Sequence, residues 1–405
     1  LWIDLDRFKE INDSLGHMIG DALLRAVVDR FSSTLDGRGH LARFGGDEFV
    51  IICPEMDRAS AQTIAQEIIA IFQHGIEVGA HNLPVTASVG LAVGPQDGRD
   101  SDELMQHADL ALYQAKQSGR NQAISFTWSM KERFHRIHEI ETGLRRALEN
   151  DELTLHFQPI FELSTGRIAL CEALLRWDNP ALGAVSPAEF IPIAESIGVI
   201  EQITEWVLQR ACEAAADWPD DVRIAVNISS SLLKSGDLAA NVVAALLHTG
   251  VSARRLELEV TESIFLEDNA HTTQILRDLQ RIGLRLVLDD FGTGYSSLSY
   301  LRSYHFDGIK IDRSFMAGIE ASREDQAIVR AVGYLAADLG MEIVAEGIET
   351  EGQLQYARNA GIHNVQGYLM CKAESRLLVT DMITRGVTIG DAIAVRSRRR
   401  VATRA

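Results

Sequence analysis

The sequence predicts two folded domains: a ferredoxin-like or palm-like α+β domain, and after it an α/β domain with the (β/α)8 architecture of a TIM barrel. A length of 405 residues suits about two or three domains. Residues 1–126 mix strand-like alternation with helical spacing, whereas eight apolar strand-like runs alternate with helical ones from residue 153 onward. The hydrophobic fraction of 46% allows packed cores and excludes a fully disordered chain.

The first domain opens with a strand over residues 1–6, in which apolar residues alternate with Trp2, Asp4 and Asp6. The two acids therefore share one face of the strand. The elements expected next are a helix over 21–31, a strand–turn–strand over 41–53 with Gly45 and Gly46 at the bend, a helix over 59–72, a strand over 85–93 and a helix over 102–117. This order predicts helices packed on one antiparallel sheet.

Apolar residues repeating every three or four positions predict a connecting helix over residues 128–150. The expected boundaries are therefore 1–127 for the first domain, 128–150 for the linker helix and 151–385 for the barrel. The arginine-rich residues 386–405 are expected to form a basic, disordered tail.

Composition limits the class of partner. Lys plus Arg is 39 and Asp plus Glu is 57, which gives a net charge of -18 and argues against a nucleic-acid binder. The four cysteines lie far apart without a CxxC pair, so we expect a reducing, cytoplasmic compartment. No apolar run approaches the ~18 residues of a membrane span. The chain opens inside a strand and without Met, so the sequence is compatible with an upstream sensor or membrane tether.

The strand-like runs of the barrel are 153–161, 168–176, 223–228, 256–260, 285–289, 308–311, 342–345 and 364–368. Polar groups cluster toward their C-terminal ends, where the active sites of such barrels lie: Gln158, Glu172, Asn227, Glu259, Asp289, Asp290, Lys310, Glu346 and Gln366.

This cluster consists of oxygen donors and one amine, which suits Mg²⁺ or Mn²⁺ and disfavours zinc. Two divalent ions roughly 3.5–4 Å apart would neutralise the acids and activate a water toward a phosphodiester. Lys310 could position or deprotonate that water or offset developing charge. Each acid taken alone is equally compatible with an ordinary strand end or helix cap.

Residues 152–378 resemble the EAL family of cyclic di-GMP phosphodiesterases. The matching motifs are Glu172-Ala173-Leu174, Val226-Asn227-Ile228-Ser229, Glu259-Val260-Thr261-Glu262, Asp289-Asp290-Phe291-Gly292-Thr293-Gly294-Tyr295-Ser296-Ser297, Lys310-Ile311-Asp312 and Ala345-Glu346-Gly347-Ile348-Glu349-Thr350. A proline usual after the family's late Gln-Gly-Tyr-Leu-x-x-Lys motif is replaced by Ala373.

The resemblance implies a two-metal hydrolase. One metal would be held by Glu172, Asn227, Glu259 and Asp289, and the second by Asp289, Asp290 and Glu346. Lys310 would lie beside the attacking water. The dinucleotide would contact Gln158, Arg176, Gln366, Asp312 and Glu349. Glu262 would brace the loop 291–297 that orders the metal pair.

A second acidic site is predicted at the hairpin bend of the first domain. If the first strand neighbours this hairpin, Asp4 and Asp6 meet Asp47 and Glu48, and the acids could hold Mg²⁺ against a triphosphate. Taken alone, Gly-Gly-Asp-Glu is also a common hairpin turn.

Residues 1–125 resemble a GGDEF diguanylate cyclase domain through Asp4-x-Asp6-x-Phe8-Lys9-x-x-Asn12-Asp13, Gly16-His17-x-x-Gly20-Asp21 and Gly119-Arg120-Asn121. The resemblance implies Mg²⁺ with GTP bound at Asp4 and Asp47, and Glu48 beside the reacting hydroxyl. It assigns guanine to Asn12 and Asp21, and phosphates to Lys9, Lys116 and Arg120. The family's opening helix has no counterpart before Leu1, and the product-inhibition motif is replaced by Asp36-Gly37-Arg38-Gly39.

The sequence therefore predicts metal-dependent hydrolysis of cyclic di-GMP to pGpG, in a chain that is expected to dimerise and to bind GTP. A bifunctional enzyme that also makes cyclic di-GMP is one alternative. A catalytically silent nucleotide receptor is the other.

Overall fold

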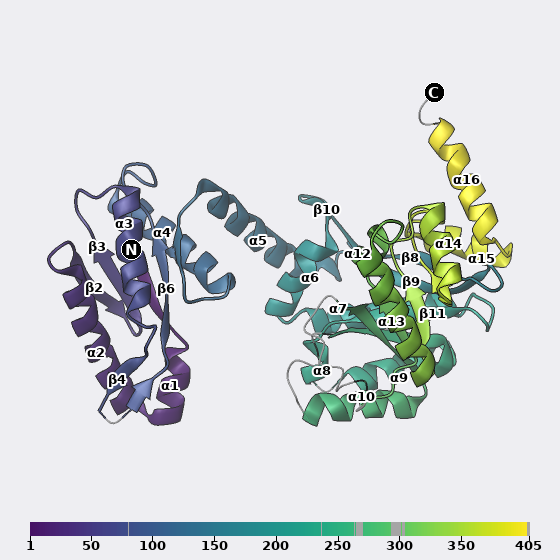
Figure 1. Cartoon of the computed structure of the whole chain (residues 1–405), viewed down its shortest axis with the longest axis horizontal. Coiled ribbons are helices and arrows are strands. Elements are labelled where there is room, and N and C mark those ends of the chain that lie inside the picture. The colour runs from purple at the N-terminus through teal and green to yellow at the C-terminus, as the bar shows by residue number, and fades with distance from the viewer. Residues whose placement is uncertain are drawn as a thin grey trace. The chain divides into compact units, whose positions relative to one another are not determined.

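The computed structural model describes residues 1–79, 81–235, 237–262, 264, 270–292, 301 and 304–402. It divides the chain into two compact units, Leu1–Glu139 and Ile140–Ala405 (Figure 1). The boundary falls within α5 (Trp128–Ala147), which confirms a helix in the connecting segment. Among the described residues, no helix is both long and apolar enough to cross a bilayer.

A five-stranded sheet in the order β2-β3-β1-β6-β7 forms the centre of the first unit. Its strands are β1 (Trp2–Asp6), β2 (His40–Gly45), β3 (Glu48–Ile52), β6 (Thr86–Leu91) and β7 (Ala123–Ser125). Strand β1 lies between β3 and β6 and runs antiparallel to both. The prediction of a purely antiparallel sheet is wrong at one edge, because β7 pairs parallel with β6. A separate hairpin joins β4 (Ile76–Val78) and β5 (His81–Leu83).

Helices pack on both faces of this sheet. They are α1 (Phe8–Leu15), α2 (His17–Leu35), α3 (Arg58–Ala70) and α4 (Ser101–Gln117). Ile3 and Leu5 are fully buried in a core with residues of α2 and α3, whereas Trp2 packs with Ala108 and Leu112 of α4. Because side chains alternate along a strand, Asp4 and Asp6 share the α4 side with Trp2.

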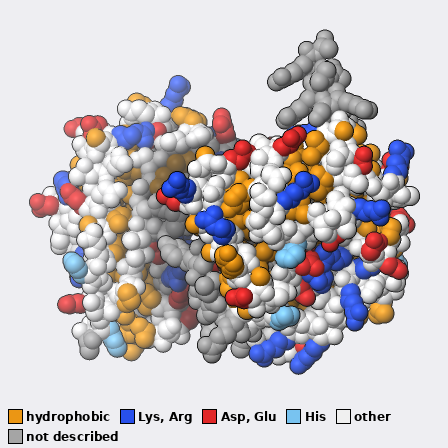
Figure 2. Space-filling view, turned by 45° about the vertical axis from the view of Figure 1, so that its right-hand side comes forward, with side chains coloured by type: hydrophobic (Ala, Val, Ile, Leu, Met, Phe, Trp, Pro, Cys, Tyr) orange, Lys and Arg blue, Asp and Glu red, His pale blue; other side chains and the backbone are white. Residues whose placement is uncertain are grey.

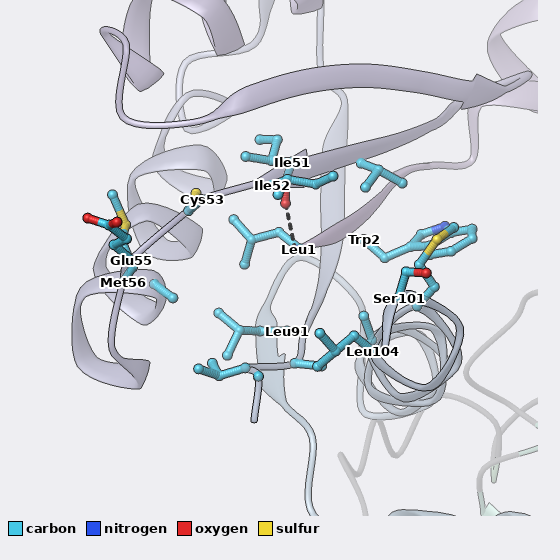
Figure 3. A pocket seen from close by; sticks show the side chains of 17 residues that line it. Leu1, Trp2, Ile51, Ile52, Cys53, Glu55, Met56, Leu91, Ser101 and Leu104 are labelled. Atoms are coloured by element: carbon cyan, nitrogen blue, oxygen red, sulfur yellow. Dashed lines mark hydrogen bonds between the residues drawn. The ribbon is translucent and has the colours of Figure 1, made fainter. Parts of the chain in front are cut away.

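An apolar pocket of about 350 Å³ lies beside the start of β1. Leu1 and Trp2 line it together with Ile51 and Cys53 of the β3 segment and Leu104 of α4 (Figure 3). The amino group of Leu1 donates a hydrogen bond to the Ile51 carbonyl at 2.8 Å.

The second unit is a closed eight-stranded barrel. Its strands are β8 (Leu153–Glu162), β9 (Ile168–Asn179), β11 (Arg223–Ile228), β12 (Leu256–Thr261), β13 (Arg285–Phe291), β14 (Gly308–Ile311), β15 (Glu342–Ala345) and β16 (Asn364–Val365). The prediction of a barrel is confirmed, but the prediction that helices alternate with all eight strands is wrong. Strand β8 runs antiparallel to both β9 and β16, and the turn 163–167 leads directly into β9. Two short strands, β10 (Gly183–Val185) and β17 (Glu374–Ser375), pair with β9 and β8.

Helices surround the barrel (Figure 1). They are α6 (Pro187–Ser196), α7 (Ile200–Ala215), α8 (Leu232–Ser235), α9 (Leu238–Thr249), α10 (Ala270–Ile282), α12 (Arg313–Ala317), α13 (Arg323–Leu339), α14 (Glu351–Asn359), α15 (Arg376–Thr384) and α16 (Ile389–Ala402), with a short 3-10 helix η1 (Ala253–Arg255). The start of α14 is fixed by a capping box in which Thr350 and Gln353 exchange hydrogen bonds. Apolar side chains are visible on this face of the molecule in several groups (Figure 2).

The tail that was expected to be disordered forms α16 instead. Ile389 and Ala392 on its first turns are buried in the barrel core. The Asp391 carboxylate accepts hydrogen bonds from the backbone N–H and hydroxyl of Thr388 at 3.0 and 2.6 Å. Apolar burial and capping at the start of the segment therefore outweigh the repulsion expected from the later arginines.

An ion-pair network occupies the N-terminal ends of the parallel strands. The buried Glu257 carboxylate lies 2.8 Å from Arg223 and 3.1 Å from Arg285. Both guanidinium groups also contact Glu342, at 2.8 and 3.2 Å. This network lies at the opposite strand ends from the polar cluster predicted above, and every charge in it has an opposite neighbour.

Candidate functional site

Lys310 of β14 is the centre of the polar cluster inside the barrel. Its side chain is 1% exposed, and its Nζ lies 2.7 Å from Glu346 and 2.9 Å from Glu259. Longer contacts of 3.4 and 3.6 Å join it to Asp289 and Glu172. Four carboxylates from β9, β12, β13 and the residue after β15 thus converge on one ammonium.

Strand register explains this convergence. Asn227 of β11 pairs with Glu259 of β12, and Thr261 at the end of β12 pairs with Asp289 of β13. Because the strands are parallel and staggered around the barrel, their late residues meet at one mouth. The Glu172 carboxylate accepts hydrogen bonds from the amides of Asn227 and Gln366, each at 2.6 Å.

Gln158 reaches the same site by a different route from the one predicted. It lies in the middle of the antiparallel strand β8 and not at a C-terminal strand end, and the β8–β9 register places it directly opposite Glu172. Its amide donates a 3.2 Å hydrogen bond to the Cys371 carbonyl. The side chain is therefore tied to the loop after β16.

A compact group of acids is formed by Asp289, Asp290 and Glu346, each of which offers an oxygen within 4.8 Å of the others. Asp290 has a left-handed backbone, with φ of 52°, which is uncommon for a residue other than glycine. Its N–H donates to the Asp289 carboxylate at 2.9 Å. Consecutive residues of an ideal strand point to opposite faces, and this departure lets both acids serve one centre.

Burial and mutual repulsion change the pKa values of the acids in this centre. Burial raises the pKa of Glu346 to about 7, with Asp289 and Glu172 adding to the effect of burial and Lys310 opposing it. Burial likewise raises the pKa of Glu259 well above its usual range. Burial alone would raise the pKa of Glu172, but Lys310 and the two amide donors lower it. Several acids in such a site ionise together only when cations are present.

The charge on Lys310 is secured by these neighbours. Burial alone would lower the pKa of Lys310, but Asp289, Glu172, Glu259 and Glu346 together raise it well above the usual value for lysine. The protonated side chain donates a hydrogen bond to the Glu259 carboxylate at 2.9 Å.

Other predicted residues have local partners in the structure. The half-buried Arg176 donates to the Leu175 carbonyl at 2.9 Å. Asp312 caps α12 by accepting from the Ser314 N–H at 2.9 Å. Glu349 lies exposed on the turn before α14. Glu262 is buried, with 6% exposure, but most of the loop that it was predicted to brace, residues 293–297, lies outside the described residues.

Gly367 is a site-forming residue that the motif analysis missed. A Cβ at this position would lie 2.1–2.6 Å from backbone atoms of Ile348. The close approach permits hydrogen bonds from the Ile348 N–H to the Gln366 carbonyl at 3.0 Å and from the Leu369 N–H to the Ile348 carbonyl at 2.8 Å. It joins the turn that carries Glu346 to the turn that carries Gln366. The Gly-Tyr pair after Gln366 was the only sequence signal for it.

The acidic centre of the first domain is more open. Asp4 pairs across β1 and β3 with Glu48, and its carboxylate lies 2.7 Å from Lys116 Nζ of α4. Burial raises the pKa of Asp4 against the influence of Lys116, and Asp47 and Asp6 add to the rise. Asp4, Asp47 and Glu48 are thus brought together as predicted, while Lys116, expected at phosphates, pairs with Asp4.

Asp6 is held firmly in place beside this centre. Its carboxylate accepts hydrogen bonds from the hydroxyls of Thr86 and Ser88 at 2.7 and 2.8 Å and from the Asn121 N–H at 3.2 Å. Asn12 packs on Gly20, where an added Cβ would lie 1.9 Å from its Oδ1. The side chains of Lys9, Asp21 and Arg120 are exposed.

Comparison with known proteins matches both domains. The EAL domain family model covers residues 141–373, and the model of the diguanylate cyclase GGDEF domain covers residues 1–122. Cyclic di-GMP phosphodiesterase NbdA of Pseudomonas aeruginosa is 41% identical over 92% of this chain and 48% of its own length. The bifunctional diguanylate cyclase/cyclic di-GMP phosphodiesterase MucR of the same organism is 39% identical over 91% of this chain and 55% of its own.

Among solved structures, the PaMucR phosphodiesterase in complex with c-di-GMP is 39% identical, with a TM-score of 0.57, and the match covers 60% of this chain and 99% of that one. The chain spans about half the length of the curated relatives that it matches. The predicted family is confirmed: this chain belongs to the EAL family, with a GGDEF domain preceding its EAL domain.

Proposed function

We propose that the EAL domain hydrolyses cyclic di-GMP to the linear dinucleotide pGpG. The observation that carries this proposal is the convergence of four carboxylates on the buried Lys310 at the barrel mouth. Support also comes from the solved c-di-GMP complex of a phosphodiesterase that is 39% identical to this chain.

EAL domains are metal-dependent, and the residues present suit a pair of Mg²⁺ or Mn²⁺ ions. Glu172, Glu259, Asp289, Asp290 and Glu346 are five carboxylates against the single ammonium of Lys310. When all are ionised, four negative charges stay uncompensated, which two divalent cations would match. All the candidate ligand atoms are oxygens, and these hard cations prefer oxygen ligands.

We assign one ion to Glu172, Asn227, Glu259 and Asp289, and the other to Asp289, Asp290 and Glu346. Bound there, the ions would supply Lewis-acid polarisation of a phosphoryl oxygen and a more acidic water. The hydrogen bonds that Asn227 and Gln366 donate orient the Glu172 carboxylate. The Lys310 ammonium would offset the negative charge that develops on the phosphoryl oxygens.

Substrate positioning falls to residues at the rim. Gln158, Arg176 and Gln366 would hold the dinucleotide, with Asp312 and Glu349 as further contacts. Glu262 would brace the segment that follows Asp290. A substrate held by several such groups presents one phosphodiester to the acidic centre and gains from reduced freedom.

For the GGDEF domain we propose binding of GTP with Mg²⁺ at Asp4 and Asp47, with Glu48 beside the reacting hydroxyl. Asn12 and Asp21 would contact guanine, and Lys9, Lys116 and Arg120 the phosphates. Synthesis of cyclic di-GMP would further require two copies of the domain facing each other, because two GTP molecules must be joined. The cross-strand pairing of Asp4 with Glu48 supports this assignment.

The experiment incubates the chain with cyclic di-GMP and either Mg²⁺, Mn²⁺ or a chelator, and separates the products by chromatography with mass detection. We expect pGpG with either ion and none with the chelator. Binding of cyclic di-GMP without turnover under any metal condition would instead support a silent receptor.

A further inference from the structure

A second cavity of the barrel domain lies between the loop after β16 and helices α15 and α16. It measures about 360 Å³, a size within the range of about 300–1,000 Å³ that is usual for small-molecule sites. Its apolar lining is supplied by Met370 of the loop, Leu378 and Met382 of α15, Val387 between the helices, and Ala392 and Val395 of α16. Two methionines make this lining adaptable in shape.

Charged groups at the cavity favour an anion. Lys372, Arg385 and Arg396 line it, against Glu374 and Asp381. Asp381 and Arg385 pair with each other at 2.8 Å, which leaves Lys372 and Arg396 against Glu374. Arg396 differs: its Nη1 is buried and has no hydrogen-bond partner among the described residues. A buried donor without an acceptor is costly, and a ligand carboxylate would supply the acceptor.

This cavity is distinct from the dinucleotide site that the family shares. The EAL match ends at residue 373, whereas α15 and α16, which form most of the walls, begin at Arg376 and Ile389. The cavity nevertheless contacts the catalytic mouth through one loop. Cys371, between the lining residues Met370 and Lys372, accepts the hydrogen bond from Gln158, which lies opposite Glu172.

We propose that this cavity binds a medium-chain fatty acid, with its carboxylate at Arg396 and its hydrocarbon chain among Met370, Leu378 and Met382. The apolar lining excludes a wholly polar anion, and the unpaired guanidinium nitrogen disfavours a neutral alcohol. Occupation would shift the loop 370–372 and with it Gln158. That regulatory consequence rests on the hydrolysis proposed above, whereas the binding itself does not.

The test measures binding of decanoate to the full chain by titration calorimetry, below its micelle concentration and without nucleotide or metal. 1-Decanol serves as the ligand control, because it has a similar hydrocarbon chain and no charge. Arg396→Met removes the guanidinium and keeps an apolar side chain, Arg396→Lys restores a cation, and Met382→Trp fills the cavity. Circular dichroism and thermal unfolding verify that each variant folds.

We expect one decanoate per chain, weaker binding by about tenfold in Arg396→Met with partial recovery in Arg396→Lys, and loss of binding in Met382→Trp. Absence of decanoate binding, or equal binding by wild type and both Arg396→Met and Met382→Trp, would overturn the proposal. Equal affinity for decanol would overturn the role of Arg396. A second arm follows cyclic di-GMP hydrolysis with and without decanoate, and we expect a changed rate in wild type and a smaller change in Arg396→Met. Decanoate binding without any rate change would refute the coupling alone.

Discussion

The two acidic centres of this chain differ in how their charge is held. In the barrel, Lys310 is 1% exposed and is surrounded by carboxylates from several strands. In the GGDEF domain, the Lys116 side chain is 34% exposed, and within the part of the chain that the structure describes its ion-pair partner is Asp4. One centre is built into the closed wall of a barrel, and the other lies at the edge of a hairpin.

The comparison indicates that burial decides how much an ion pair contributes to the stability of the fold. Burial strengthens each interaction of the Lys310 cluster and also makes any missing partner expensive. Solvent reaches the Asp4–Lys116 pair from the Lys116 side only, because the Asp4 side chain is 12% exposed, so we expect the release of Lys116 to cost less than the loss of Lys310. We therefore expect substitutions in the barrel centre to affect both stability and activity, and substitutions in the hairpin centre to affect mainly ligand binding.

The largest contrast should come from Lys310→Met compared with Lys116→Met. We expect Lys310→Met to reduce hydrolysis of cyclic di-GMP by about 10²-fold or more. In chelator it should also lower the free energy of unfolding by about 3–5 kcal/mol, because buried acids lose their counter-charge. Lys116→Met should cost less than about 1 kcal/mol. Denaturant titration and initial rates measure these effects, and equal losses of stability in the two variants would contradict the comparison.

Gly367→Ala tests how closely the two turns at the barrel mouth must approach. The added Cβ would lie 2.1–2.6 Å from the Ile348 backbone and push the Glu346 turn away from the Gln366 turn. We expect a loss of hydrolysis of about 10²-fold from this misplacement. Gly333→Ala is the matched control, since its Cβ would meet nothing closer than 3.8 Å and α13 should gain up to about 1 kcal/mol. Similar rates in both variants would refute the positioning role.

Glu257→Gln separates burial from catalysis. Glu257 is as buried as the acids of the mouth but lies in the ion-pair network at the other strand ends, with Arg223 and Arg285. We expect this variant to lose about 2 kcal/mol of stability and to keep its rate of hydrolysis per folded molecule. A rate that fell with stability preserved would show that the two ends of the barrel are not independent.

Asp6→Asn should have the smallest effect. An amide replaces a carboxylate that accepts three hydrogen bonds, so we expect the first unit to lose about 1–2 kcal/mol. The unfolding of the barrel unit should stay unchanged, because each unit has its own hydrophobic core. Calorimetry resolves the transitions, and a shift of the barrel transition would be the contrary result.

The sequence motifs predicted most residues of the polar cluster in the barrel. Glu259, Asp289 and Lys310 each stand late in an apolar run, whereas Glu172, which was predicted with them, lies near the middle of β9. All strands of the barrel but one run parallel. The exception, β8, could not be found from its own residues, since an apolar run has the same pattern in either direction. Gln158 therefore lies opposite Glu172 as a member of the predicted cluster, but in the middle of an antiparallel strand and not at a C-terminal strand end.

Features that depend on tertiary packing were also missed. The Gly-Tyr pair after Gln366 marks Gly367 in the sequence, but it does not identify Ile348 as the residue whose backbone Gly367 approaches. The helix α16 was missed because its arginines dominate the composition of the segment, whereas its first turns are held by Ile389 and Ala392 in the core. In α16, burial of apolar side chains outweighs the local composition.

The most direct test of the assignment crosses two variants with two substrates. Wild type, Glu172→Gln and Glu48→Gln are each given cyclic di-GMP or GTP with Mg²⁺, and all products are quantified. We predict that hydrolysis of cyclic di-GMP to pGpG is lost in Glu172→Gln by at least about 10²-fold and stays at the wild-type rate in Glu48→Gln. Undiminished pGpG formation by folded Glu172→Gln, or its loss in Glu48→Gln, would contradict the claim that the barrel centre is the phosphodiesterase.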